Sequence, residues 1–200
     1  MRTFRSAALV CTLFILAGIS AAQIQEVDIA VGGGTTFSAR PTSASEAFQP
    51  PAQRGGLYPS VSAQVTRGDN FGLNAEFDFR YKEATYNGFQ RYRPTQYDVN
   101  LVYAPDVNKK TKVDIMAGVG GQTTIFYNTF NSCNANAGAC TVHFNSTHFA
   151  LHVGFDVRRY IWRNYFIRPE VHYFRIIDNS EFHSDNLIRV GATIGYSWGR

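Results

Sequence analysis

The stretch that decides the fold runs from Phe71 to Lys82 and reads Phe-Gly-Leu-Asn-Ala-Glu-Phe-Asp-Phe-Arg-Tyr-Lys. Every second residue, beginning at Phe71, is apolar or aromatic, and the residues between them are glycine, polar or charged. A period of two residues places successive side chains on opposite faces of a β-strand. The stretch is therefore predicted to be a strand with one apolar face and one charged face.

The same alternation recurs along the chain in segments of about ten residues or more. We expect eight strands, at residues 26–37, 57–66, 71–86, 95–104, 112–127, 147–160, 165–177 and 186–198. Long connections, at residues 38–56, 87–94, 128–146 and 178–185, alternate with tight turns rich in Gly, Asn, Asp and Pro. Long loops on one rim and short turns on the other are typical of a barrel that crosses an outer membrane.

Alternation leaves open which face is inside, because a soluble lipocalin-like barrel turns its apolar face inward. An eight-stranded barrel encloses a lumen only just wide enough for side chains. The apolar faces carry too many large residues for such a lumen, and aromatic residues form bands near both ends of the strands. We therefore predict an all-β protein, an eight-stranded antiparallel up-and-down transmembrane β-barrel with its apolar faces outward.

The N-terminus predicts export. Arg2 and Arg5 precede an apolar run from Ala7 to Ile19 and small residues before Gln23, which is the pattern of a cleaved secretory signal peptide. We expect residues 1–22 to be the signal peptide and residues 23–200 one barrel domain. Without the leader, 17 basic residues face 15 acidic ones, scattered rather than clustered, so nucleic acid is not an expected partner.

The end of the last strand carries the most specific motif, Arg189-x-Gly191-x-x-Ile194-x-Tyr196. With the strand pattern before it, this motif resembles the small outer-membrane barrels of the OmpA and OmpX type. The resemblance implies the bacterial outer membrane as location, with outer-membrane lipid and lipopolysaccharide as surroundings and the barrel-assembly machinery as a partner during insertion.

The predicted inner faces carry acids and bases in similar numbers, which favours a network of ion pairs that fills the lumen. The predicted lumen residues are Asp28, Glu76, Asp78, Arg80, Lys82, Asp98, Lys112, Asp114, His152, Asp156, Arg158, Arg168, Glu170, His172 and Arg189. If the sixth and seventh strands pair around the Trp162 turn, Asp156 lies opposite Arg168 and His152 opposite His172. Two histidines beside Glu170 are a possible metal site, but hydrogen-bonded filling is the preferred interpretation, and no metal or cofactor is expected.

The long loops carry the remaining candidate features. Cys133 and Cys140 are an even pair in an exported chain, so a disulfide is favoured over free thiols. Glu181, His183 and Ser184 invite comparison with lipid A deacylases, yet their spacing differs and they lie in a loop. We expect a non-enzymatic barrel whose loops serve an unknown surface ligand or envelope integrity. A narrow porin-like channel and a lipid A-modifying enzyme are the alternatives.

Overall fold

The computed structural model describes residues 24–40, 50–68, 70–86, 90–129 and 141–199. The predicted signal peptide at residues 1–22 lies outside the described residues, so its cleavage stays a prediction. The same holds for the disulfide between Cys133 and Cys140. The described part of the chain contains no helix long and apolar enough to cross a membrane.

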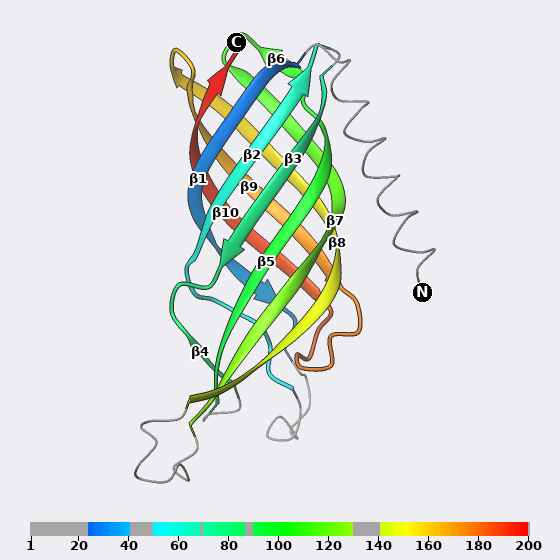
Figure 1. Ribbon diagram of the computed structural model, residues 1–200. Coiled ribbons are helices and arrows are strands. Elements are labelled where there is room, and N and C mark those ends of the chain that lie inside the picture. Colours follow the sequence, from blue (N-terminus) through cyan, green and yellow to red (C-terminus); the bar gives the residue numbers. More distant parts are fainter. Residues whose placement is uncertain (1–23, 41–49, 69, 87–89, 130–140, 200) are drawn as a thin grey trace, which may run out of the picture.

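Eight long antiparallel strands close into a barrel (Figure 1). They are β1 (Ile24–Ser38), β2 (Tyr58–Arg67), β3 (Phe71–Phe79), β5 (Gln90–Tyr103), β7 (Thr111–Thr129), β8 (Thr141–Trp162), β9 (Tyr165–Ile176) and β10 (Asn186–Trp198). Pairing of β1 with β10 closes the ring, so the barrel body leaves no strand edge to aggregate. The predicted all-β, eight-stranded fold is confirmed.

Two short strands were not predicted. β4 (Ala84–Tyr86) forms a hairpin with the start of β5, and β6 (Asp106–Asn108) pairs with β7. The strand predicted at residues 71–86 therefore ends at Phe79, and β5 begins five residues earlier than predicted. β7 and β8 also continue to pair as far as Thr129 and Thr141, inside the loop predicted at residues 128–146.

Alternation in the sequence did not predict these extensions because their outward residues are polar. His143 and Asn145 are exposed on the added part of β8, and they lack the apolar face that marked the other strands. A strand needs an apolar outer face only where lipid covers it. The extended parts of β4, β5, β7 and β8 together form a four-stranded arm beyond the barrel body (Figure 1).

The barrel is apolar outside and charged inside. Along β9 exposure alternates at every residue, so that Ile167 and Val171 are 40% and 47% exposed whereas Arg168 and Glu170 are buried. This orientation excludes the lipocalin-like alternative, because that fold requires an apolar interior. Aromatic side chains such as Trp162 line the short-turn rim as predicted, but Tyr160 is buried in the lumen instead of joining that band.

Candidate functional site

The inner faces bring most of the predicted lumen residues together. Thirteen of the fifteen are buried, and they come from seven strands: Asp28, Glu76, Asp78, Asp98, Lys112, Asp114, His152, Asp156, Arg158, Arg168, Glu170, His172 and Arg189. They share the inner face because each strand alternates with a period of two. Buried charges must be paired to be tolerated, so their contacts define what the lumen can do.

Two predicted lumen residues lie elsewhere. Lys82 is exposed, and Arg80 is half-buried at the long-loop end, where its Nη1 donates to the carbonyl of Gly55 at 2.7 Å. β3 ends at Phe79, so alternation no longer directs the side chains beyond it. Glu26 was missed although it is buried. Its position two residues before Asp28 on the same strand was the available signal.

Arg158 and Lys112 organise the lumen near the short turns. Arg158 is fully buried, pairs with Asp28, and donates from Nη2 to Asp114 Oδ1 at 2.6 Å. Lys112 pairs with Glu26, which also accepts a 2.6 Å hydrogen bond from the hydroxyl of Tyr160. These contacts join β1, β7 and β8 across the lumen, so they tie strands together that are far apart in sequence.

Arg189 and Arg168 organise the middle of the lumen. Arg189 pairs with Glu76 and Asp78 on β3 and, at 3.3 Å, with Glu170 on β9. Arg168 lies 3.4 Å from Glu170 and donates from Nη2 to the hydroxyl of Ser62 on β2 at 2.8 Å. Guanidinium groups suit this role because their planar fork binds several oxygens at once. The lumen is thus filled by bonded side chains.

The predicted register between the sixth and seventh strands was wrong by two residues. Asp156 lies opposite Glu170, and His172 lies opposite Gly154. The causes are the turn and a β-bulge: the hairpin closes over two residues, with Arg163 in the left-handed region at φ 48°, and the register shifts again by one residue between Tyr160 and Trp162. The two histidines still meet diagonally, with His152 Nε2 2.9 Å from His172 Nδ1.

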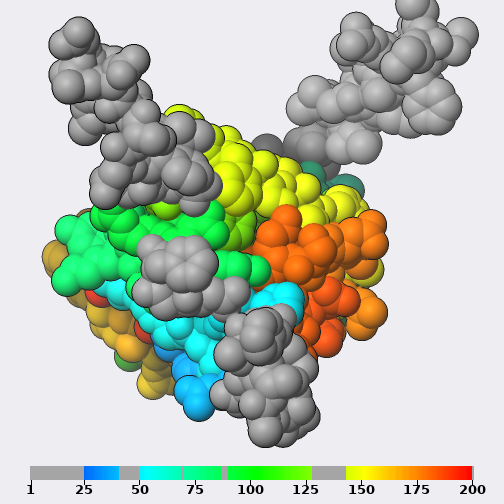
Figure 2. Space-filling model, turned by 90° about the horizontal axis from the view of Figure 1, so that it is seen from below, coloured from blue at the N-terminus to red at the C-terminus, as the bar shows by residue number. Residues whose placement is uncertain are grey.

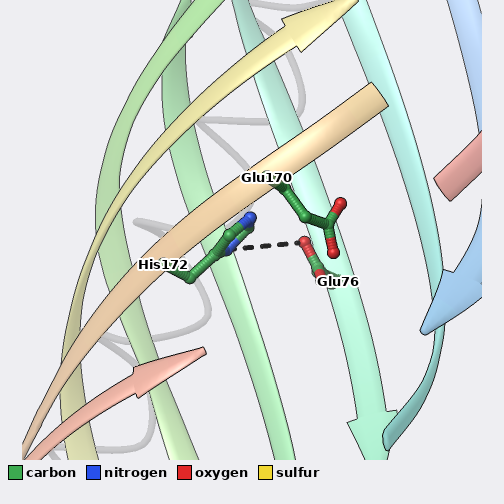
Figure 3. Close-up of side chains that lie close together, drawn as sticks. All are labelled: Glu76, Glu170 and His172. Atoms are coloured by element: carbon green, nitrogen blue, oxygen red, sulfur yellow. Dashed lines mark ion pairs between the residues drawn. The ribbon is translucent and has the colours of Figure 1, made fainter. Parts of the chain in front are cut away.

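Three of these side chains have the donor types of a metal site. The ligand atoms of Glu76, Glu170 and His172 lie within 4.8 Å of one another (Figure 3). However, Nη2 of Arg189 donates to Glu76 and lies 3.3 Å from Glu170 Oε1 and 3.5 Å from His172 Nδ1. A guanidinium nitrogen therefore takes the place that a cation would need, and the three residues form an arginine-binding cluster.

At the long-loop mouth, the described part of the first loop (residues 50–57) lies beside the last loop (residues 177–185), shown in cyan and orange in Figure 2. Gln53 is buried, and its Nε2 donates to Gln122 Oε1 at 3.2 Å. The amide of His183 donates to the carbonyl of Pro51 at 3.2 Å, which joins the first loop to the last. Phe182 completes an aromatic cluster on the inner face of the arm, with ring centroids 5.2 to 6.4 Å from its neighbours Tyr86, Tyr92 and Phe126.

A serine, a histidine and a glutamate also meet at this mouth. Nε2 of His148 lies 2.8 Å from Ser146 Oγ and 2.7 Å from Glu181 Oε2, and the Ser146 hydroxyl itself donates to Glu181. Burial acts to raise the pKa of Glu181, but the bonds from Ser146 and His148 outweigh it and lower that pKa. A catalytic triad places its carboxylate on the other ring nitrogen, so this arrangement does not activate Ser146.

The serine, histidine and acid compared with deacylases in the sequence are not brought together in the same way. The hydroxyl of Ser184 donates to the carbonyl of Asn186 at 3.2 Å and accepts from the Asn186 amide at 3.1 Å. Glu181 instead contacts the arm through Ser146 and His148. These contacts fasten the last loop to the arm, which is a structural role.

Comparison with known proteins yields structural neighbours alone. No family model and no curated protein matches the sequence. The solved structures of Ail from Yersinia pestis, in complex with the heparin analogue sucrose octasulfate, and of Neisserial surface protein A each give a TM-score of 0.58, with 11% and 13% identity. Both comparisons cover 86% of this chain, and 98% and 95% of those chains.

A major outer membrane protein from Thermus thermophilus gives a TM-score of 0.63 at 10% identity, over 86% of this chain and 99% of that one. Identities this low establish the fold alone. The described barrel, with its closed ring of eight strands and apolar outer face, agrees with that likeness. The chain therefore has the fold of the small eight-stranded outer-membrane β-barrels.

Proposed function

We propose that this protein is a non-enzymatic barrel of the bacterial outer membrane, with a sealed lumen and surface loops that serve interaction or envelope integrity. The observation that carries the proposal is the filled lumen. Arg158, Arg168 and Arg189 are fully buried and bonded across the barrel, and Gln53 is inserted at the mouth. A solute path would require these bonded groups to leave their partners, at a cost of several kcal/mol each.

Single-channel recording in planar lipid bilayers tests the sealed lumen. We expect the purified, refolded barrel to leave the bilayer at its baseline conductance. Steady, ion-selective openings would contradict the proposal and favour the narrow porin-like alternative. Protease protection and heat-modifiable migration control for insertion, because both report the folded barrel independently of conductance. They are applied to the full chain and to a variant lacking residues 50–56, which removes Gln53 and its neighbours.

Lipid A modification is tested separately. The Ser146, His148 and Glu181 cluster lacks the relay geometry that acyl transfer requires, so we expect no change in lipid A. Mass spectrometry of lipid A from cells with and without the protein measures this directly. A lost or added acyl chain that depends on Ser146 would overturn the non-enzymatic proposal.

A further inference from the structure

The outer face of β8 carries a positive charge in an apolar surround. Its outward residues are Phe149, Leu151, Val153, Phe155, Val157, Arg159 and Ile161, of which Arg159 alone is charged. Arg159 is exposed, and it lies opposite Thr111 on β7 and Ile167 on β9. A charge on the lipid face of a barrel is unfavourable at the bilayer centre and tolerated near the interface. The depth of Arg159 therefore decides what it can bind.

Aromatic rings place the membrane interface just beyond Arg159, at the rim opposite the arm (Figure 1). Trp162 stacks on Tyr165 with ring centroids 5.7 Å apart, and the band continues through Tyr196 to Trp198 at 4.9 and 4.8 Å. Such a band lies at the level of the lipid headgroups. Trp162 is opposite Tyr165, so Arg159 lies on the membrane side of the band. It is therefore within reach of the lipid phosphates.

Two further basic residues lie at the same place. The guanidinium of Arg163 lies 5.7 Å from the centroid of the Trp162 ring. The carbonyl of Lys110 accepts a 2.9 Å hydrogen bond from the amide of Tyr160, the residue after Arg159. Both Arg163 and Lys110 are exposed. Lys110, Arg159, Arg163 and Trp162 are called the basic patch below.

The described acids near the basic patch do not neutralise it. Arg159 Nη1 donates to Thr111 Oγ1 at 3.0 Å, and none of the three basic residues forms an ion pair within the described part of the chain. Asp106, the exposed acid of β6, lies 3.9 Å from Lys112 and lines the opening of the lumen. Asp156, the nearest acid along β8, is fully buried. The basic patch therefore presents a net positive charge to the membrane surface.

We propose that the basic patch binds the headgroup of an anionic phospholipid in the leaflet on the short-turn side. The inference rests on the proposed outer-membrane location, because the short turns of such barrels face the periplasm. Guanidinium groups bind phosphate oxygens with two parallel hydrogen bonds, and basic residues near an anionic lipid surface are attracted to it. The exposed side chain of Ile167, opposite Arg159 on β9, offers apolar surface to the acyl chain below the headgroup.

Quenching of tryptophan fluorescence by brominated lipids tests the proposal. Trp198→Phe leaves Trp162, which is 65% exposed, as the single tryptophan of the barrel. The barrel is refolded into mixed vesicles of phosphatidylcholine and phosphatidylglycerol, with bromine on the acyl chains of one lipid or the other. The ratio of the two quenching curves gives the lipid preference at Trp162. We expect phosphatidylglycerol to be preferred about fivefold, and the preference to vanish in about 1 M salt.

Variants assign the preference to the basic patch. Arg159→Gln combined with Arg163→Gln should abolish it, whereas Arg159→Lys should retain most of it because the charge is kept. Arg67→Gln is the matched control, since it removes an exposed charge from the same rim on β2, across the ring from β8, and should leave the preference unchanged. Heat-modifiable migration and quenching by brominated phosphatidylcholine report folding and insertion of each variant.

The proposal is overturned if both lipids quench the inserted barrel equally, or if the double variant keeps the preference. It is also overturned if inorganic phosphate abolishes the preference and NaCl of equal ionic strength does not, because the patch would then take a free anion. Weaker quenching by both lipids at a higher protein-to-lipid ratio would assign the patch to a second copy of the chain instead. A barrel that fails to insert at all would contradict the proposed function itself, so the two failures are distinguishable.

Discussion

Replacement of Arg189 by methionine probes the centre of the lumen. Arg189 is fully buried and pairs with Glu76, Asp78 and Glu170 on two other strands. At 3.3 Å, the Arg189–Glu170 distance, two unit charges attract by about 5 kcal/mol at an effective dielectric constant of about 20. Desolvation of the guanidinium offsets much of this attraction, so removal of one partner from a buried pair costs about 3–5 kcal/mol.

Urea unfolding of the refolded barrel in detergent micelles measures this loss, with the fluorescence of Trp162 and Trp198 as the signal. With a urea dependence of about 2 kcal/mol per molar, the midpoint should fall by about 2 M. Arg175→Met is the matched control, because Arg175 is exposed on the neighbouring strand β9 and should cost less than about 0.5 kcal/mol. A loss below about 1 kcal/mol for Arg189→Met, equal to that of the control, would refute a stabilising role for the network.

Three further predictions concern the mouth and the wall. Phe182→Ala removes a buried ring from the aromatic cluster and should make residues 178–185 sensitive to protease. The unfolding midpoint of the barrel should change little. Equal protection of these residues in the wild-type protein and the variant would contradict the prediction. The lowered pKa of Glu181 means that its bonds to Ser146 and His148 are fully present above its usual pKa of 4.5 and are lost as pH falls through its lowered pKa. The hydrogen-exchange protection factor of the His183 amide, which donates to the carbonyl of Pro51, should therefore fall in acid, and Glu181→Gln should remove that pH dependence. Gly120→Val should prevent folding, because a Cβ at Gly120 meets the backbone of β5 at Tyr97. Gly55→Asn should fold, because open space surrounds Gly55 and asparagine tolerates its φ of 66°. Recovery of folded Gly120→Val on heat-modifiable gels would contradict the close approach of the two strands at Gly120.

The sequence predicted the barrel well because lipid imposes a simple rule on it. Residues such as Phe77 and Val153 had to be apolar and outward, and Asp78 and His152 had to be accommodated inside, so a period of two residues sufficed. The rule fails where lipid ends. β4 and the outer part of β8 escaped prediction, and Lys82 was assigned to a face that its backbone no longer maintains.

The contacts between strands were harder to predict than the face of the barrel, inner or outer, on which each residue lies. A tight turn at Arg163, together with a β-bulge between Tyr160 and Trp162, moved His172 from a position opposite His152 to a diagonal one, and nothing in local alternation reports such a shift. Ser146 and His148 meet Glu181 because a loop folds back over the arm. Long-range closure of that kind depends on the three-dimensional path of the chain, so composition alone does not reveal it.

The four-stranded arm lies outside the region where a transmembrane strand must fit lipid on one face and the lumen on the other. β8 has 22 residues, roughly twice the 9 to 11 that a tilted strand needs to cross a bilayer. The half nearer Trp162 must fit both lipid and the lumen, whereas the part beyond Phe149 towards Thr141 contacts neither the apolar belt nor the charged lumen. Substitutions or short insertions in the arm should therefore leave the membrane-spanning part of the barrel intact, so the arm is a natural place to graft a foreign epitope onto this fold.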